Sequence, residues 1–270
     1  MRRPGIAVVG VALVCSGLAC TPEEAEASTT TLGVAAAPSL SAAFTEIVGI
    51  FEDENPGVRV HLELGRSDDI SEGLSDRTDL NVFASASEDA MAHAVERGTA
   101  AEPRVFARNH VVVAVPSGNP RQVRGLDDLA RPDLRVGLCD VSAPCGKAAE
   151  KLLLAAGVTP AEVTWEVGSR ALSARLADHE LDVGIVYRTD VAGSHGWVSD
   201  VDASADIDEQ ERELMREAGT TRYVLARVPG GEVGPDAETK RIAAAGFREL
   251  VTSERGRQAL RNAGLGPLPA

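Results

Sequence analysis

The sequence lacks several patterns that would mark a metalloenzyme or a nucleotide-binding protein. It has no Gly-x-x-x-x-Gly-Lys phosphate loop, and its five histidines are scattered without a His-Glu-x-x-His run. Zinc chemistry is therefore not expected. Lysine is scarce, with only Lys147, Lys151 and Lys240 in 270 residues, and the formal net charge is −14. Such an acidic chain argues against nucleic acid as a partner, and any anion site must be built from local groups.

The N-terminus has the features of an export signal. Two arginines precede an apolar run from Ile6 to Val14, which is too short to span a membrane, and small residues then lead to Cys20. Residues 21–29 are polar and lack periodicity, as expected of a flexible tether. We therefore interpret residues 1–20 as a signal peptide that directs the chain out of the cytoplasm.

The cysteine at the end of this signal resembles the acylated cysteine of bacterial lipoproteins. The resemblance implies cleavage before Cys20, lipid attachment to its thiol, and anchoring at the outer face of the cytoplasmic membrane. Lipoprotein signals usually have a leucine three residues before the cysteine, whereas Gly17 stands there and Leu18 follows it. Secretion without a lipid is the alternative.

Two further cysteines, Cys139 and Cys145, lie in the exported part of the chain. An oxidising compartment and the short separation favour a local disulfide between them. A metal site or a nucleophilic cysteine is the alternative, although no additional ligands follow with metal-site spacing.

From Thr29 onward, short β-like runs alternate with longer amphipathic helical patterns, which is typical of parallel α/β units. A chain of 270 residues with 44% hydrophobic residues can form two medium-sized domains. The acidic run 206–217 is interpreted as a solvated helix face. Strands are predicted at residues 32–37, 58–64, 80–84, 110–115, 134–139, 163–167, 183–187 and 223–228.

Two of these strands, 110–115 and 223–228, are predominantly apolar, and each is followed by a turn rich in proline and glycine. We interpret them as twin crossover strands between two lobes that enclose a cleft. Lobe I is predicted to contain residues 30–111 and 225–270, and lobe II residues 112–224.

Four predicted strands end in a small or polar turn that opens directly into a helix. Each helix N-terminus offers unpaired N–H donors and about half a positive charge, which suits an anion held without lysine or arginine. Two turns from each lobe are expected to converge on the cleft, although a serine at a helix start can simply be an N-cap. The turns are Pro38-Ser39, Gly65-Arg66-Ser67, Ala143-Pro144-Cys145-Gly146 and Gly168-Ser169.

Several segments together resemble the molybdate-binding proteins of bacterial ABC transporters, over nearly all of residues 30–268. The resemblance implies a two-lobed α/β fold like that of periplasmic binding proteins, which closes on a tetrahedral dianion. Its motifs are Ala-Ala-Pro-Ser-Leu at 36–40, Gly-Arg-Ser at 65–67, Asn-Val-Phe-Ala-Ser-Ala at 81–86, Phe-Ala-Arg-Asn at 106–109, Ala-Pro-Cys-Gly at 143–146, Gly-Ile-Val-Tyr-Arg-Thr-Asp at 184–190, and the ending at 256–267.

The resemblance also implies five ligand-binding residues. Ser39 and Ser67 match serines that donate hydrogen bonds to the anion, and Cys145 and Ser169 fall where backbone N–H groups are used. Tyr187 matches the tyrosine whose phenol closes the cage. Molybdate carries no proton at neutral pH, so a cage of donors alone suits it. The same residues would bind tungstate, which has the same shape and charge.

Two positions depart from the family pattern, which has Ala-Ala-Ala-Ser-Leu and Gly-Ser-Ser at these turns. Pro38 stiffens the first turn, and Arg66 brings a cation near the second. Asp68 and Asp69 could accept a proton from hydrogen phosphate, or they could simply complement the helix dipole. Sulfate and phosphate are therefore the alternative ligands.

The predicted protein is a non-catalytic receptor, expected to be monomeric, that delivers an oxyanion to the membrane permease of an ABC importer. It requires no cofactor. An enzyme with Cys145 as its nucleophile and a sensor that binds the same anion are the alternatives from other classes.

Overall fold

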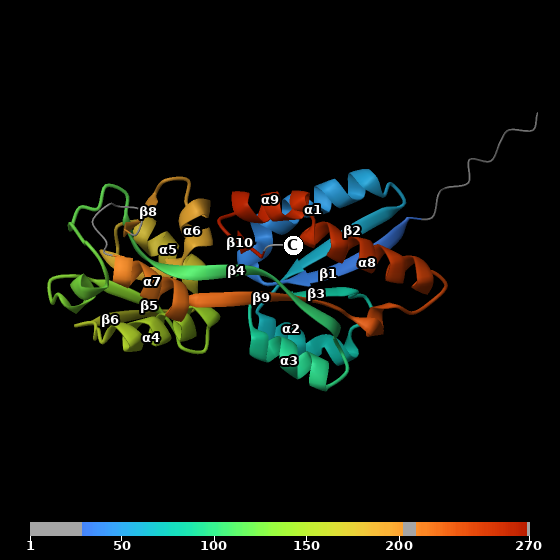
Figure 1. Cartoon of the computed structure of the whole chain (residues 1–270), viewed down its shortest axis with the longest axis horizontal. Helices are drawn as coiled ribbons and strands as arrows, with labels where there is room; N and C mark the ends of the chain where they lie inside the picture. The colour runs from blue at the N-terminus through green and yellow to red at the C-terminus, as the bar shows by residue number, and fades with distance from the viewer. Residues whose placement is uncertain (1–28, 202–208, 269–270) are drawn as a thin grey trace, which may run out of the picture.

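The structure is a computed structural model that describes residues 29–201 and 209–268. The predicted signal peptide with Cys20, and tether residues 21–28, lie outside these ranges. Two lobes lie side by side along the long axis of the molecule and are joined by two long strands (Figure 1). Among the described residues, no helix is long and apolar enough to cross a membrane.

Lobe I is built on parallel strands in the order β2-β1-β3, with β9 antiparallel to β3. Its strands are β1 (Thr30–Ala36), β2 (Val58–Leu64) and β3 (Val82–Ser85), and the short β10 (Gly266–Pro267) pairs with β4. Its helices are α1 (Ser41–Glu54), α2 (Ser67–Gly73), α3 (Glu88–Glu96), α8 (Ala237–Thr252) and α9 (Glu254–Asn262). The C-terminal helices α8 and α9 pack back on this lobe beside α1, as expected from the sequence.

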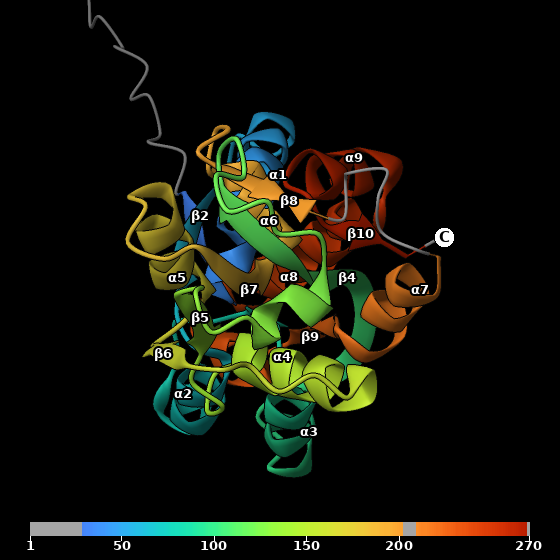
Figure 2. The ribbon, with the colours of Figure 1, turned by 90° about the vertical axis from the view of Figure 1, so that its left-hand side faces the viewer.

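Lobe II repeats the parallel arrangement in the order β7-β5-β6. Its strands are β5 (Val136–Cys139), β6 (Val163–Glu166), β7 (Val183–Tyr187) and β8 (Val198–Asp200). Its helices are α4 (Pro144–Ala156), α5 (Ser169–Ala177), α6 (Arg188–Gly193) and α7 (Glu209–Ala218). In Figure 2 the strands lie between α4 on one side and α5 on the other, so both faces of the sheet are covered.

The two connecting strands are β4 (Ala101–Pro116) and β9 (Thr220–Arg227), which run antiparallel to each other. The first part of β4 pairs with β9, whereas residues 111–114 pair with β7 of lobe II. One strand therefore belongs to both sheets, which confirms the crossover prediction. The predicted strand at 110–115 is only the second half of β4, because the first half is largely exposed and carries charged side chains such as Arg104 and Arg108.

The lobes have separate hydrophobic cores of different character. Lobe I contains a chain of tilted and edge-on aromatic pairs that links Phe51, Phe247, Phe44, Phe106 and Tyr223. The core of lobe II is mainly aliphatic and begins at Val111. Separate cores allow the lobes to move as units, while the exact boundaries at 111/112 and 224/225 stay a prediction.

Candidate functional site

The four predicted turns all form helix starts at the carboxyl ends of strands. A single 3₁₀ turn, η1 (Pro38–Leu40), follows β1, while α2, α4 and α5 follow β2, β5 and β6. The N-cap residues are Ala37, Arg66, Ala143 and Gly168, and none of them caps its helix through its side chain. The serines therefore do not act as N-caps. The N–H groups of Leu40 and Gly146 bond back to the carbonyl of their N-cap residue. No such bond forms in the described ranges from the N–H groups of the other first-turn residues that concern the site, namely Ser39, Ser67, Cys145 and Ser169.

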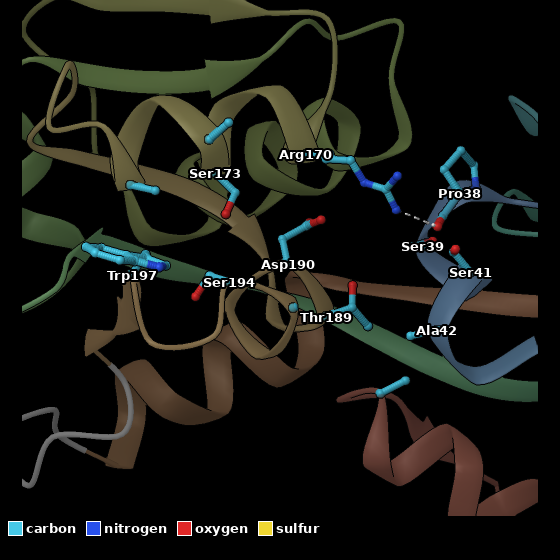
Figure 3. A pocket seen from close by; sticks show the side chains of 14 residues that line it. Pro38, Ser39, Ser41, Ala42, Arg170, Ser173, Thr189, Asp190, Ser194 and Trp197 are labelled. Carbon is cyan, nitrogen blue, oxygen red and sulfur yellow. Dashed lines mark hydrogen bonds between the residues drawn. The ribbon is translucent and has the colours of Figure 1, made fainter. Parts of the chain in front are cut away.

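Two arginines join these turns in pairs across the cleft. Arg66 Nη2 donates to the backbone oxygen of Ser142, in the turn before α4, at 3.5 Å. Arg170 Nη2 donates to the backbone oxygen of Pro38, in the turn before α1, at 3.2 Å (Figure 3). Each contact links lobe I to lobe II, so all four turns converge where the lobes face each other. Arg66 also lies 3.7 Å from the exposed Asp69 carboxylate.

A chain of hydrogen bonds connects Ser39 to lobe II. The hydroxyls of Ser39 and Tyr223 are 2.7 Å apart, and Asn109 Nδ2 donates to the Tyr223 phenol at 3.2 Å. The same amide nitrogen donates to the Thr189 hydroxyl at 3.0 Å. Burial raises the pKa of Tyr223 to about 12, with the bonds from Ser39 and Asn109 opposing the rise. The network is therefore uncharged at neutral pH.

Tyr187 stands at the end of β7 and is buried. Its phenol lies 2.9 Å from the hydroxyl of Thr221 on β9. Burial, with a smaller contribution from the nearby Tyr223, raises the pKa of Tyr187 well above its ordinary value. The phenol therefore keeps its proton and can donate a hydrogen bond to an anion.

Ser67 is the first residue of α2 and is also buried. Its hydroxyl oxygen accepts a hydrogen bond from the backbone N–H of Ala86 at 2.9 Å. Because a hydroxyl has one proton and two lone pairs, this bond leaves the Ser67 proton available for a ligand.

Asp190 is a functional candidate that the sequence reasoning missed, although it ends the recognised motif at 184–190. Its carboxylate accepts hydrogen bonds from the Ser169 hydroxyl and from the backbone of Tyr187. Burial raises the pKa of Asp190, while Ser169 and the charge of Arg170 oppose the rise. Its buried Oδ2 has no hydrogen-bond partner among the described residues. The bond from Ser169 engages its hydroxyl and leaves its backbone N–H for the cleft.

Cys139 and Cys145 are joined in a disulfide with a Cα–Cα distance of 5.9 Å. The bond closes the turn between β5 and α4, where a Cβ on Gly146 would lie 2.0 Å from the Asp140 backbone oxygen. Only glycine fits this close approach. Neither sulfur is a free thiolate, so the nucleophile required by the enzyme alternative is missing. No cluster of three metal-binding side chains occurs in the described ranges.

A cavity of about 400 Å³ opens between the lobes beside Ser39 (Figure 3). Of the five predicted ligand-binding residues, Ser39 alone lines it; Ser67, Cys145, Ser169 and Tyr187 lie outside its lining. Arg170, Asp190 and the exposed indole of Trp197 contribute to its walls. The other lining residues are Pro38, Ser41, Ala42, Ser173, Ala174, Ala177, Thr189, Gly193, Ser194 and Ala263.

A two-lobed α/β fold with paired crossover strands, whose free helix starts meet in the cleft, defines a solute-binding protein. Comparison with known proteins agrees: residues 32–266 match the family of bacterial extracellular solute-binding proteins, and the chain belongs to it. The molybdate-binding protein ModA of Mycobacterium tuberculosis (strain ATCC 25618 / H37Rv) is 33% identical over 200 residues, which cover 70% of this chain and 77% of that protein.

Solved structures show the same fold. The periplasmic molybdate-binding protein of Azotobacter vinelandii superposes with a TM-score of 0.66 at 16% identity, covering 88% of this chain and 100% of that chain. The sulfate-binding protein SubI of Mycobacterium tuberculosis H37Rv gives a TM-score of 0.67 at 19% identity, with coverage of 88% and 87%. The fold is therefore shared by proteins named for different oxyanions.

Proposed function

We propose that this protein captures molybdate outside the cytoplasm and delivers it to the permease of an ABC importer. The observation that carries the proposal is the convergence of four uncapped helix starts in one cleft, linked across the lobes by Arg66 and Arg170. These starts present N–H donors and the positive ends of helix dipoles to the same region. Similarity to a mycobacterial molybdate-binding protein supports the choice of anion.

The proposed cage contains donors from five residues. Ser39 and Ser67 contribute hydroxyls, Cys145 and Ser169 contribute backbone N–H groups from the first turns of α4 and α5, and Tyr187 contributes its phenol. The raised pKa of Tyr187 keeps that proton in place. A fully deprotonated dianion such as molybdate or tungstate can accept every one of these bonds.

Attachment to the membrane is part of the proposal. Lipidation of Cys20 would hold the protein at the outer face of the membrane, and residues 21–29 would let a monomer reach the permease. Mass spectrometry of protein extracted from membranes tests this step. A diacylglycerol-modified N-terminal Cys20 is expected, whereas an unmodified N-terminus released to the medium would contradict it.

Isothermal titration of the chain without residues 1–20 tests the choice of anion. Molybdate and tungstate are expected to bind one to one, and sulfate and phosphate to give no heat. Preference for sulfate or phosphate would assign the cleft to that oxyanion instead. No heat from any of the four anions would contradict an oxyanion receptor.

A further inference from the structure

A second hollow between the lobes lies around β4 and β9. Several basic side chains line it, and some of them have no ion-pair partner. It consists of two overlapping cavities of about 420 and 200 Å³. Both are lined by Lys151 of α4, Thr220 and Arg222 of β9, and Glu88 of α3, so the walls come from both lobes. Arg108 of β4 lines the larger cavity, and Lys147 of α4 lines the smaller one. We call this region the basic hollow.

The cations of the basic hollow differ from the other cations of the protein. In the described part of the chain, the side chains of Arg104, Arg108, Lys147 and Lys151 form neither an ion pair nor a hydrogen bond. Every other lysine and arginine whose side chain the structure describes is engaged. Three of these four line the basic hollow. Two of them are among the three lysines of the whole sequence.

Acidic side chains also line the basic hollow, but they are fewer than the basic ones. Arg222 lies 3.6 Å from Glu88, and Arg216 pairs with Glu213. Asp89 and Glu217 complete the acidic lining. Five basic side chains line the basic hollow against three acidic ones, and three of the five, Arg108, Lys147 and Lys151, form no ion pair. The lining is therefore locally positive on a protein whose net charge is −14.

The basic hollow adjoins three of the proposed anion donors. Its lining includes Ala86, whose N–H bonds Ser67 Oγ at 2.9 Å, and Thr221, whose hydroxyl lies 2.9 Å from the Tyr187 phenol. It also includes Pro144, the residue before Cys145. An anion in the basic hollow is thus one layer of residues away from the donors.

We propose that the basic hollow is the entrance through which a small inorganic oxyanion reaches the cleft, and that Arg108, Lys147 and Lys151 accelerate its capture. A net charge of −14 repels dianions at long range, but fields are screened beyond about 8 Å at physiological ionic strength. Within that distance, cations that line a concave surface focus the local field and raise the association rate. This inference rests on the proposed function and adds the route of capture.

Stopped-flow measurement of molybdate association, followed by the fluorescence of Trp165 and Trp197, tests the entrance. The double variant Lys147→Gln/Lys151→Gln is expected to lower the association rate constant about tenfold at low ionic strength, with the dissociation rate constant unchanged. The difference is expected to shrink as salt is added, because salt screens exposed charges. Adding Arg108→Gln should lower the rate further.

The control variant removes two positive charges that lie outside the basic hollow. Arg104→Gln/Lys240→Gln matches the double variant, and Arg104 lies on the same strand as Arg108. Equal losses in the control and test variants would overturn the proposal, since overall charge would then set the rate. A faster dissociation with unchanged association would overturn it too, by placing these cations on the bound anion. If the unmodified chain binds no oxyanion, the proposed function fails, and the entrance fails with it.

Discussion

The helices at the cleft and two helices elsewhere begin in different ways. The Ser87 hydroxyl at the start of α3 accepts the N–H of Ala90 at 3.1 Å, and Ser253 at the start of α9 accepts the N–H of Gly256 at 3.3 Å. At the cleft, η1, α2, α4 and α5 have no such bond. A missing cap costs about 1 kcal/mol of helix stability.

In the proposed function, this difference divides the serines between helix stability and anion binding. At α3 and α9 the serine is the N-cap and satisfies the helix itself. At the cleft, Ser39, Ser67 and Ser169 are displaced by one or two residues into the first turn, where they cannot cap. In the proposed cage, first-turn N–H groups there bind the anion, and the hydroxyls of Ser39 and Ser67 add to them.

The largest expected effect comes from replacing a serine with alanine, once at the cleft and once at an N-cap outside it. Ser39→Ala is expected to weaken molybdate binding about tenfold to a hundredfold, because a hydrogen bond to a charged group contributes about 1.5–3 kcal/mol. Ser253→Ala should leave binding unchanged and lower the free energy of unfolding by about 1 kcal/mol. Titration calorimetry and urea unfolding measure the two quantities. Equal effects on binding would remove the distinction between the classes.

The disulfide lies at the uncapped start of α4 and closes the turn that precedes this helix. Cys139→Ser/Cys145→Ser is expected to lower the free energy of unfolding by about 2 kcal/mol, the entropy of closing so short a loop. Binding should weaken as well, since the turn carrying the Cys145 N–H is released. Titration of the folded variant well below its unfolding temperature separates the two effects. Unchanged affinity would mean that Gly146 and the helix hold the turn without the disulfide.

Asp190 distinguishes α6 from the four uncapped helices, because its carboxylate accepts the backbone N–H of Tyr187 at that helix start. Its pKa is raised by burial above the ordinary 3.8, so the folded state holds the proton more tightly than the unfolded state. Its contribution to stability is therefore complete below about pH 3.8 and is lost as pH rises through the raised value. The free energy of unfolding of Asp190→Asn, relative to that of the unmodified protein, should therefore increase as pH rises. Urea unfolding from pH 4 upward measures this difference. A constant difference across that range would contradict the raised pKa.

The smallest expected effect comes from adding a cap at the cleft. Gly168 is the N-cap of α5, its φ of 176° is extended, and a Cβ there meets nothing within 4 Å. Gly168→Ser is expected to raise stability by a few tenths of a kcal/mol, because the new hydroxyl can bond a first-turn N–H. The same bond should weaken molybdate binding. Gly168→Ala is the matched control, and an equal loss of affinity there would point to the added carbon atom.

Local patterns predicted most elements of the fold. The strands at 58–64 and 183–187 agree with β2 and β7 to the residue, because apolar periodicity and the flanking turns both mark their ends. The sequence reasoning missed α6, β8 and the first half of β4. α6 has no buried residue and β8 is three residues long, so neither carries a hydrophobic period.

The site was predicted less completely than the fold. The four turns were identified because each joins a strand to a helix, which is a local property. Asp190 was missed because an acid in a first helical turn usually complements the dipole, and only its burial against Ser169 distinguishes it. The basic hollow was missed because its lining comes from α3, α4, α7, β4 and β9, and no motif connects them.

By itself, the sequence determined the alternation of strands and helices, the helix starts that could bind an anion, and the cysteine pair, because these depend on neighbouring residues and short spacings. Only the tertiary structure decided which turns face each other and which cations stay unpaired. Arg66 meets Ser142, and Arg170 meets Pro38, across separations of 76 and 132 residues. Such distant groups meet only when two independently packed lobes are placed together by β4 and β9, and no local preference of the chain encodes that placement.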